Sequence, residues 1–266
     1  MIEPFLKWAG GKRWLAASDA LPRPSDYNRY IEPFLGGGAI FFKLLPSRAI
    51  ISDLNPSLIE LYLIVRDEPD RLKRRLEVHH ALHCSEHYYS VRDHVPDCAI
   101  DRAARMLYLN RTCWNGLYRV NQKGEFNVPI GTKQMVIGES ESFIEASEAL
   151  KKAEIRICDF SETISRAGEG DFLFVDPPYT VKHNMNGFVK YNEKIFSWSD
   201  QVRLRDAVLS ASKRGAAVVV TNADHESLHD LYAADFGYKS LSRSSVLSGL
   251  SSGRGKTTEA LFFVNM

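Results

Sequence analysis

The sequence lacks the features that mark a membrane or secreted protein. It has no run of apolar residues long enough to span a bilayer, and its start, Met1-Ile2-Glu3-Pro4, lacks the basic and then apolar stretch of a signal peptide. Cysteine is scarce: four residues occur, without close pairing or zinc-ligand spacing, at Cys84, Cys98, Cys113 and Cys158. We therefore expect free thiols and a reducing, cytoplasmic setting.

The chain also has little net charge. Its 34 basic and 33 acidic residues leave a formal charge of +1, so the total does not indicate a nucleic-acid binder. Charge is nevertheless concentrated in two segments: residues 239–258 contain no acid, and residues 111–133 contain only Glu125. Both segments carry glycines or serines that bring the backbone near a ligand, so we expect phosphate contacts there, with a solvated surface as the alternative. The basic residues concerned are Lys239, Arg243, Arg254 and Lys256, and Arg111, Arg119, Lys123 and Lys133.

The length of 266 residues, with 44% hydrophobic and 25% charged residues, fits one large domain or one domain with an insertion. Apolar strand patterns alternate with helical ones, which predicts an α/β fold with a mainly parallel sheet covered on both faces. We expect a late antiparallel hairpin at the sheet's edge. The predicted strands are residues 30–32, 48–53, 155–159, 172–176, 216–222, 238–246 and 259–264, and the predicted helices are 39–45, 56–67 and 199–214.

The alternation stops between about residues 69 and 135. Residues 71–109 have helical spacing and many charges, and two short apolar segments then flank Asn121-Gln122-Lys123-Gly124. This pattern predicts a helical subdomain, residues 69–135, that carries a β-hairpin and interrupts a main domain formed by residues 1–68 and 136–266.

An apolar run, residues 172–175, leads into Asp176-Pro177-Pro178-Tyr179. The tetrapeptide suits methylation of an exocyclic amino nitrogen, whose lone pair is delocalised into its ring. The Asp176 carboxylate and the Pro177 carbonyl can accept hydrogen bonds from the two amino hydrogens, while the prolines restrict the backbone. Tyr179 offers a flat face for a base taken out of its stack. A strand that ends in a proline turn is the structural alternative.

A glycine turn lies earlier in the chain. Tyr30-Ile31-Glu32-Pro33-Phe34 leads into Leu35-Gly36-Gly37-Gly38-Ala39, which predicts a strand, a turn and a helix. The dinucleotide fingerprint G-x-G-x-x-G fails at Phe41, which argues against an NAD-dependent dehydrogenase. Asp53 ends a second short strand and suits the hydroxyls of a ribose; alternatively, it caps the helix begun by Pro56. S-adenosylmethionine fits these features and supplies a methyl group.

With both motifs in place, the chain resembles the Dam-type DNA adenine-N6 methyltransferases, the D12 class or alpha group. The resemblance runs in family order over nearly the whole chain, through residues 5–12, the Glu32-Pro33-Phe34 turn, Asp53, and residues 109–119, 124–129 and 176–179. Thr112-Cys113-Trp114 departs from the family pattern. The resemblance implies a Rossmann-like S-adenosylmethionine-dependent methyltransferase sheet, with residues 69–135 as the target-recognition subdomain.

The resemblance also assigns residues to the cofactor. Asp159 accepts a hydrogen bond from the cofactor adenine and Phe160 packs on its face, although Asp159 also suits the cap of the next helix. Trp8 stacks on the cofactor or belongs to the core, and Lys12 closes the site or lies in solvent. The complete cofactor set is Trp8, Lys12, Phe34, Gly36, Gly38, Asp53, Asp159 and Phe160.

A second set of residues is predicted to contact DNA. Lys7 reaches a base edge, Trp114 fills the gap left by the target adenine, and Arg119 matches the acceptors of guanine. The remaining members are Asn115, Leu117, Asn121, Pro129, Arg254 and Lys256.

The sequence therefore predicts a cytoplasmic enzyme, nucleoid-associated or phage-encoded in a bacterium, that methylates adenine N6 in double-stranded DNA. The predicted site is GATC, reached by base flipping, and a role in restriction-modification is compatible with the sequence, which does not indicate whether a restriction enzyme accompanies the protein. No metal is predicted, because His79, His80 and His83 lack a cysteine or acid constellation. The alternatives are methylation of cytosine N4 or of RNA adenine, and a fold that only binds nucleic acid, which the intact tetrapeptide disfavours. The sequence does not indicate an oligomeric state.

Overall fold

The computed structural model describes residues 2–116, 118–121, 124–138, 141–181, 196–244 and 256–266. The chain divides into two compact units. The first unit contains Met1–Arg13, Gly36–Ser47 and Asp53–Ile157, and the second contains Trp14–Leu35, Arg48–Ser52 and Cys158–Met266. The chain passes from the second unit into the first at two places that matter for the site: between Leu35 and Gly36, at the glycine turn, and between Ser52 and Asp53, at the end of a strand.

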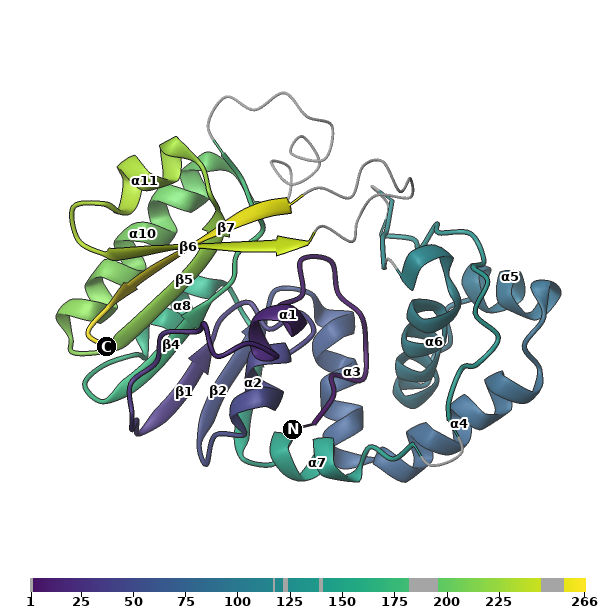
Figure 1. Ribbon diagram of the computed structural model, residues 1–266. Helices are drawn as coiled ribbons and strands as arrows, with labels where there is room; N and C mark the ends of the chain where they lie inside the picture. The colour runs from purple at the N-terminus through teal and green to yellow at the C-terminus, as the bar shows by residue number, and fades with distance from the viewer. Residues whose placement is uncertain (1, 117, 122–123, 139–140, 182–195, 245–255) are drawn as a thin grey trace. The chain divides into compact units, whose positions relative to one another are not determined.

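The described strands form a seven-stranded sheet in the order β3-β2-β1-β4-β5-β7-β6 (Figure 1). The pairs β1–β2, β1–β4 and β4–β5 are parallel, whereas β5–β7 and β6–β7 are antiparallel. This confirms the predicted α/β class, the mainly parallel sheet and the late antiparallel hairpin. The strands are β1 (Arg29–Glu32), β2 (Ala49–Asp53), β3 (Ala153–Ile157), β4 (Asp171–Val175), β5 (Ala217–Ala223), β6 (Gly237–Ser244) and β7 (Lys256–Val264).

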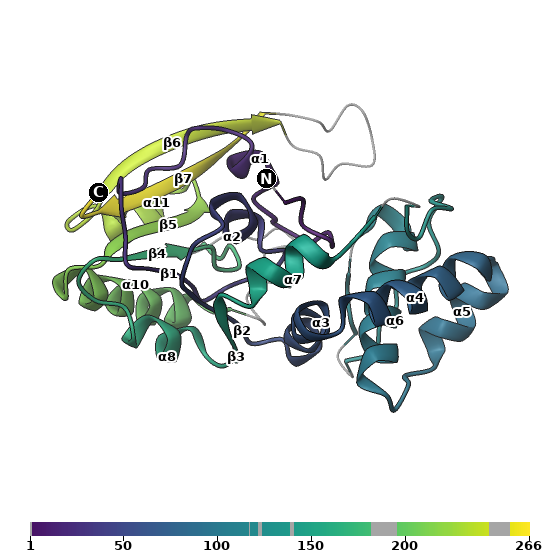
Figure 2. The same cartoon turned by 90° about the horizontal axis from the view of Figure 1, so that it is seen from below.

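In the second unit, helices α8 (Phe160–Ser165), α10 (Trp198–Lys213) and α11 (Glu226–Tyr232) cover one face of the sheet (Figures 1 and 2). Alternate residues of β5, Val218 and Val220, pack in the same core as Leu204 and Val208 of α10. All five residues of β4 are buried, as expected for a central parallel strand with both faces covered. The short helix α1 (Arg13–Ala16) begins at the boundary between the units.

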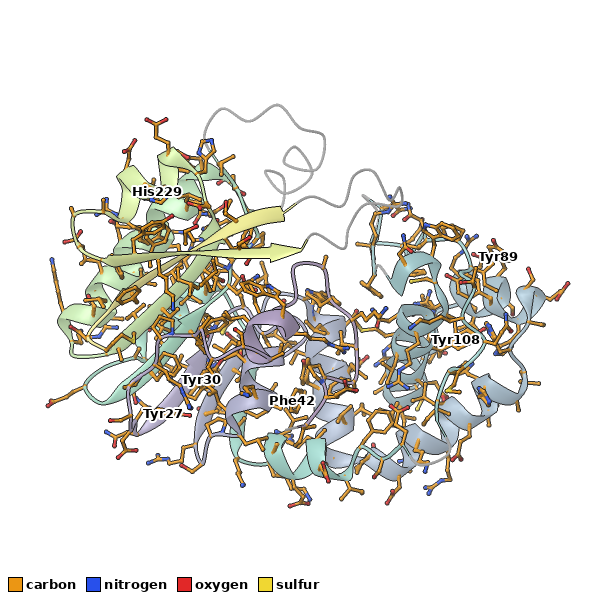
Figure 3. All side chains as sticks on the ribbon, in the orientation of Figure 1. Tyr27, Tyr30, Phe42, Tyr89, Tyr108 and His229 are labelled. Carbon is orange, nitrogen blue, oxygen red and sulfur yellow. The ribbon has the colours of Figure 1, made fainter. Side chains whose placement is uncertain are left out.

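The first unit is mostly helical. It contains α2 (Ala39–Leu44), α3 (Pro56–Asp67), α4 (Pro69–Ala81), α5 (Ser85–Asp93), α6 (Ala99–Thr112), the 3₁₀ turn η1 (Trp114–Gly116) and α7 (Ile144–Leu150). Helix α6 is the centre of this bundle: its Leu107, Tyr108 and Leu109 are fully buried. Figure 3 shows Tyr108 among the helices, where the ring of His79 stacks on it at 4.7 Å between centroids.

The predicted helix at residues 56–67 matches α3, and its cap settles one question about Asp53. The Asn55 side chain accepts from the backbone N–H of Leu58 and Pro56 occupies the first turn, so Asn55 is the N-cap. The interpretation of Asp53 as the helix cap is therefore wrong.

The predicted hairpin is represented by a bridge between Val120 and Phe126, and by a hydrogen bond from Asn121 N–H to the Glu125 carbonyl at 2.8 Å. Residues 122 and 123 of its turn lie outside the described residues. Over the described residues, no helix is long and apolar enough to cross a membrane.

Candidate active site

The catalytic carboxylate predicted from sequence lies at the carboxyl end of β4. The register that pairs Val175 of β4 with Val220 of β5 places Asp176 beside Thr221. The Thr221 hydroxyl donates to Asp176 Oδ1 at 2.6 Å, and Thr221 itself is fully buried. Asp176 is half-buried. The hydrogen bond fixes the Asp176 carboxylate through one of its oxygens.

The segment that follows Asp176 is held on both sides of Tyr179. Before Tyr179, Pro177 and Pro178 restrict the backbone. After Tyr179, the hydroxyl of buried Thr180 donates to the Phe196 carbonyl at 2.6 Å. The Tyr179 hydroxyl donates to Oε2 of Glu259 in β7 at 2.7 Å. Burial raises the pKa of Tyr179 well above its usual value, and the carboxylates of Asp176 and Glu259 raise it further. The phenol therefore stays protonated and acts as a donor.

A further carboxylate ends β1, the strand next to β4. Glu32 is buried and accepts from the Tyr30 hydroxyl at 2.9 Å. Burial raises the pKa of Tyr30 well above its usual value, followed by the effects of Glu32 and, through space, Asp176. Tyr30 is labelled on β1 in Figure 3. Carboxylates thus gather at this end of the sheet, which fits a ligand with positive charge.

The glycine turn of the first unit is packed against Trp8 and closed by Asp53. Gly36 has a φ of +48°, and a Cβ built there would lie 2.8 Å from Trp8 Cδ1, so a side chain is excluded. Asp53 accepts from the backbone N–H of Gly36 through Oδ2 and from that of Asn55 through Oδ1, each at 3.0 Å. Burial raises the pKa of Asp53 against these hydrogen bonds. Asp53 is thus fixed beside a glycine turn without side chains, where its carboxylate suits the hydroxyls of a ribose.

Gly38 and Lys12 complete the described cofactor residues of the first unit. A Cβ at Gly38, whose φ is +63°, would lie 2.8 Å from the Tyr62 hydroxyl, which itself donates to the Gly36 carbonyl. Lys12 is only 3% exposed, and its Nζ donates to the Gly10 carbonyl at 2.7 Å. The alternative that left Lys12 in solvent is therefore wrong.

The cofactor residues of the second unit form an aromatic cluster. Phe34 stacks on Phe160 with ring centroids 5.3 Å apart, and the Arg203 guanidinium lies 4.2 Å over the Phe160 ring. Asp159 accepts from Ser161 N–H as the N-cap of α8 and pairs with Arg203 at 2.8 Å. Burial alone would raise the pKa of Asp159, but the hydrogen bonds from Arg203 and Ser161 lower it. The cap interpretation of Asp159 is thus confirmed, while its role toward adenine stays a prediction.

Several predicted DNA residues meet in the first unit at the end of α6. The buried side chain of Asn110 accepts from Lys7 N–H at 2.9 Å and donates to the Lys7 carbonyl at 2.7 Å. A Cβ at Gly116 would lie 2.8 Å from Lys7 Cδ, so Lys7 runs along the η1 turn. Burial lowers the pKa of Lys7, and nearby Lys133 lowers it further. Two cationic side chains therefore lie close together beside this turn, which suits phosphate or base acceptors.

The η1 turn and the segment after it present polar and aromatic groups to solvent. Trp114 is 55% exposed, and Asn115 has the uncommon φ of +57° and is also exposed. Arg119 is exposed and donates from Nε to Asn127 Oδ1 at 3.2 Å. Asn121 is half-buried and Pro129 is exposed. Leu117 and Arg254 lie outside the described residues, and Lys256 begins β7.

Sequence reasoning missed some residues that contact the predicted ones. Thr221, Glu259 and Arg203 bond Asp176, Tyr179 and Asp159 over sequence separations of 45, 80 and 44 residues. Thr221 and Glu259 could have been found as polar residues inside apolar strands, Val218-Val219-Val220-Thr221 and Thr258-Glu259-Ala260-Leu261. Over the described residues, no cluster of three or more histidine, cysteine or acidic residues is arranged for a metal ion.

Comparison with known proteins agrees with this arrangement. Residues 8–246 match the family described as D12 class N6 adenine-specific DNA methyltransferase. The chain is 38% identical to the type II methyltransferase M1.LlaDCHI of Lactococcus lactis subsp. cremoris, over 98% of this chain and 94% of that protein. It is 37% identical to the type II methyltransferase M.MjaIII of Methanocaldococcus jannaschii, over 84% of each chain. It is 34% identical to the DNA adenine methylase of Escherichia coli K12, over 83% of this chain and 80% of that protein.

Proposed function

We propose that this chain, which belongs to the D12 class of N6 adenine-specific DNA methyltransferases, transfers a methyl group from S-adenosylmethionine to adenine N6 in double-stranded DNA. The target is proposed to lie within GATC and to be flipped out of the duplex. The observation that carries the proposal is the Asp176 carboxylate, fixed at the end of β4 by the Thr221 hydroxyl at 2.6 Å. A cytoplasmic location stays a prediction, argued from the unpaired cysteines and from DNA as the partner.

The residues fit S-adenosylmethionine, which supplies an electrophilic methyl group when bound. In the first unit, the turn at Gly36 and Gly38 excludes side chains and Asp53 stands ready for ribose hydroxyls. In the second unit, the buried carboxylate of Glu32 favours a positive ligand at the carboxyl end of β1. Phe34 and Phe160 supply aromatic surface. Roles for Trp8, Lys12 and Asp159 follow from the family pattern and stay proposals.

The chain's own residues would act on the amino group by hydrogen bonding. The Asp176 carboxylate accepts from one N6 hydrogen and the Pro177 carbonyl from the other, so the nitrogen becomes pyramidal and its lone pair becomes available. As the new N–C bond forms, the nitrogen acquires positive charge and its proton becomes acidic. Asp176 stabilises that charge and is placed to take the proton or to pass it to water. Tyr179 holds the flipped base by stacking.

The DNA contacts are proposed on the exposed residues of the first unit. Lys7, Trp114, Asn115, Arg119 and Pro129 belong to this set, and the first four include the cation, ring and amide types that read or replace bases. Leu117, Asn121, Arg254 and Lys256 complete the predicted set. The segment after α6 therefore carries the residues proposed to read GATC. This part of the chain matches the family pattern except at Thr112-Cys113-Trp114.

The test is methyl transfer to defined duplexes. The purified protein is incubated with labelled S-adenosylmethionine and duplexes that contain GATC or its single-base variants, and the digested nucleosides are identified by mass spectrometry. We expect N6-methyladenine in the GATC duplex alone. N4-methylcytosine, or transfer to RNA in preference to duplex DNA, would replace the proposed substrate.

The variant Asp176→Ala assigns the chemistry to its residue. It should abolish transfer while the dissociation constant of the cofactor, measured by calorimetry, changes little. Activity within about tenfold of wild type would reject the role of Asp176, and a wild-type protein without cofactor binding would favour the alternative of a nucleic-acid-binding fold.

A further inference from the structure

A glutamate is buried in β7, where the surrounding sequence is apolar. Glu259 is 2% exposed, and the residues that follow it, Ala260, Leu261 and Phe262, are no more than 1% exposed. A buried carboxylate is costly unless it is hydrogen-bonded, so its position calls for a specific partner. The antiparallel registers place Glu259 opposite Ala223 of β5 and Leu241 of β6. It therefore lies at the carboxyl end of β5, where Thr221 bonds Asp176.

The partner is the hydroxyl of Tyr179, which donates to Glu259 Oε2 at 2.7 Å. The backbone around Tyr179 is held by Pro177, Pro178 and Thr180, but a fixed backbone leaves the ring free to rotate about its two side-chain torsions. A hydrogen bond at the far end of the ring removes that freedom. Because the donor belongs to the Asp-Pro-Pro-Tyr segment and the acceptor belongs to the edge hairpin, the bond joins two separate parts of the second unit.

We propose that Glu259 is a positioning residue for methyl transfer, which holds the Tyr179 ring in the orientation that stacks on the flipped target base. The inference rests on the proposed function, because a flipped adenine is the base on which the Tyr179 ring would stack. Glu259 acts through the Tyr179 hydroxyl and does not itself touch the substrate. The competing role is structural, in which Glu259 only stabilises the β6–β7 hairpin.

A double-mutant cycle separates the two roles. Glu259→Met and Tyr179→Phe each remove one partner of the same hydrogen bond, so each should lower the single-turnover rate constant about tenfold, and the double variant should be no slower than either. The KM for DNA should stay within about twofold. If the loss from Glu259→Met persists in the Tyr179→Phe background and the two losses multiply, the proposal is overturned.

A spectroscopic signal reports the ring directly. In a duplex that the wild-type protein methylates, 2-aminopurine replaces the target adenine, and its emission depends on whether the flipped base is stacked. We expect both single variants to change the emission of the bound duplex in the same way. Unchanged emission in either variant contradicts a positioning role.

Asp171 provides the matched control. It is also a 2% exposed carboxylate, but it lies at the amino end of β4 and pairs with Arg29 at 2.7 Å. Asp171→Asn should lower the unfolding midpoint and leave the rate constant and the emission unchanged. If Glu259→Met does not fold, Tyr179→Phe still tests the proposal, because a full wild-type rate in that variant overturns it. If the wild-type protein methylates no adenine, the proposed function fails instead, and this outcome is visible before any variant is made.

Discussion

The substitution Thr221→Val removes the hydroxyl that fixes Asp176 and keeps nearly the same shape in a fully buried position. The lost hydrogen bond, 2.6 Å long, has a charged acceptor. Such bonds contribute about 1.5–3 kcal/mol, which corresponds to a loss of about 10- to 150-fold in rate if the whole of it acts in the transition state. Asp176 is only half-buried, so a water molecule can donate to its carboxylate in place of the lost hydroxyl. We therefore expect the lower end, about tenfold in the rate constant.

The assay is single-turnover methyl transfer at saturating cofactor, with the dissociation constant of the cofactor measured in parallel. That constant should stay within about twofold, because Thr221 acts through Asp176, which is assigned to the target amino group and not to the cofactor. Thr221→Ser is the matched variant: it retains the hydroxyl and loses only a methyl group, so its rate should return to within about threefold of wild type. A wild-type rate in Thr221→Val would refute the reasoning. An equal loss in Thr221→Ser would show that packing, not the hydroxyl, is what matters.

Three other predictions concern the first unit. Asp53→Ala should weaken S-adenosylmethionine binding by about 1.5–3 kcal/mol in calorimetry; unchanged binding would contradict its assignment to the ribose. Arg119→Ala should reduce discrimination at one guanine by about 1–3 kcal/mol in methylation of single-base duplex variants, whereas an unchanged ratio with a weaker salt dependence would make Arg119 a phosphate contact. Burial and then His87 lower the pKa of His79 from 6.5 to about 4, so the unfolded chain binds the extra proton and stability falls as pH drops from about 6.5 to 4. The free energy of unfolding from urea titrations should fall by about 1–2 kcal/mol more between pH 7 and pH 5 in wild type than in His79→Gln.

Local chemistry explains which parts of the fold were predictable. The pair Asn55-Pro56 begins α3 and its apolar spacing carries it to Asp67, as predicted. The apolar residues before Asp176 form the central strand β4, because both of its faces are buried and the run needs no alternation. Cap chemistry was ambiguous, since Asp53, Asn55 and Asp159 all have suitable side chains. Only the structure shows that Asn55 and Asp159 cap helices while Asp53 closes the glycine turn.

The supporting contacts could not be predicted, because they depend on strand order and register. Thr221 meets Asp176 only because β5 is the parallel neighbour of β4 and pairs Val220 with Val175. Arg203 meets Asp159 because α10 packs beside α8. The burial of Lys12 could not be predicted for a different reason. Its long side chain folds back so that Nζ donates to the Gly10 carbonyl two residues away, and composition does not reveal such a local hydrogen bond.

The antiparallel direction of β7 has a consequence for the site. A parallel strand beside β5 would bring its own carboxyl end to Asp176, whereas β7 brings its amino end, as the pairing of Ala223 with Glu259 shows. Lys256 begins this strand, three residues before Glu259. A predicted phosphate contact and the residue that bonds Tyr179 thus lie on one short stretch of backbone. Along that stretch, residues 256–258 pair only with β6, and the pairing with β5 begins at Glu259, so the residue that bonds Tyr179 lies where β7 becomes paired on both sides.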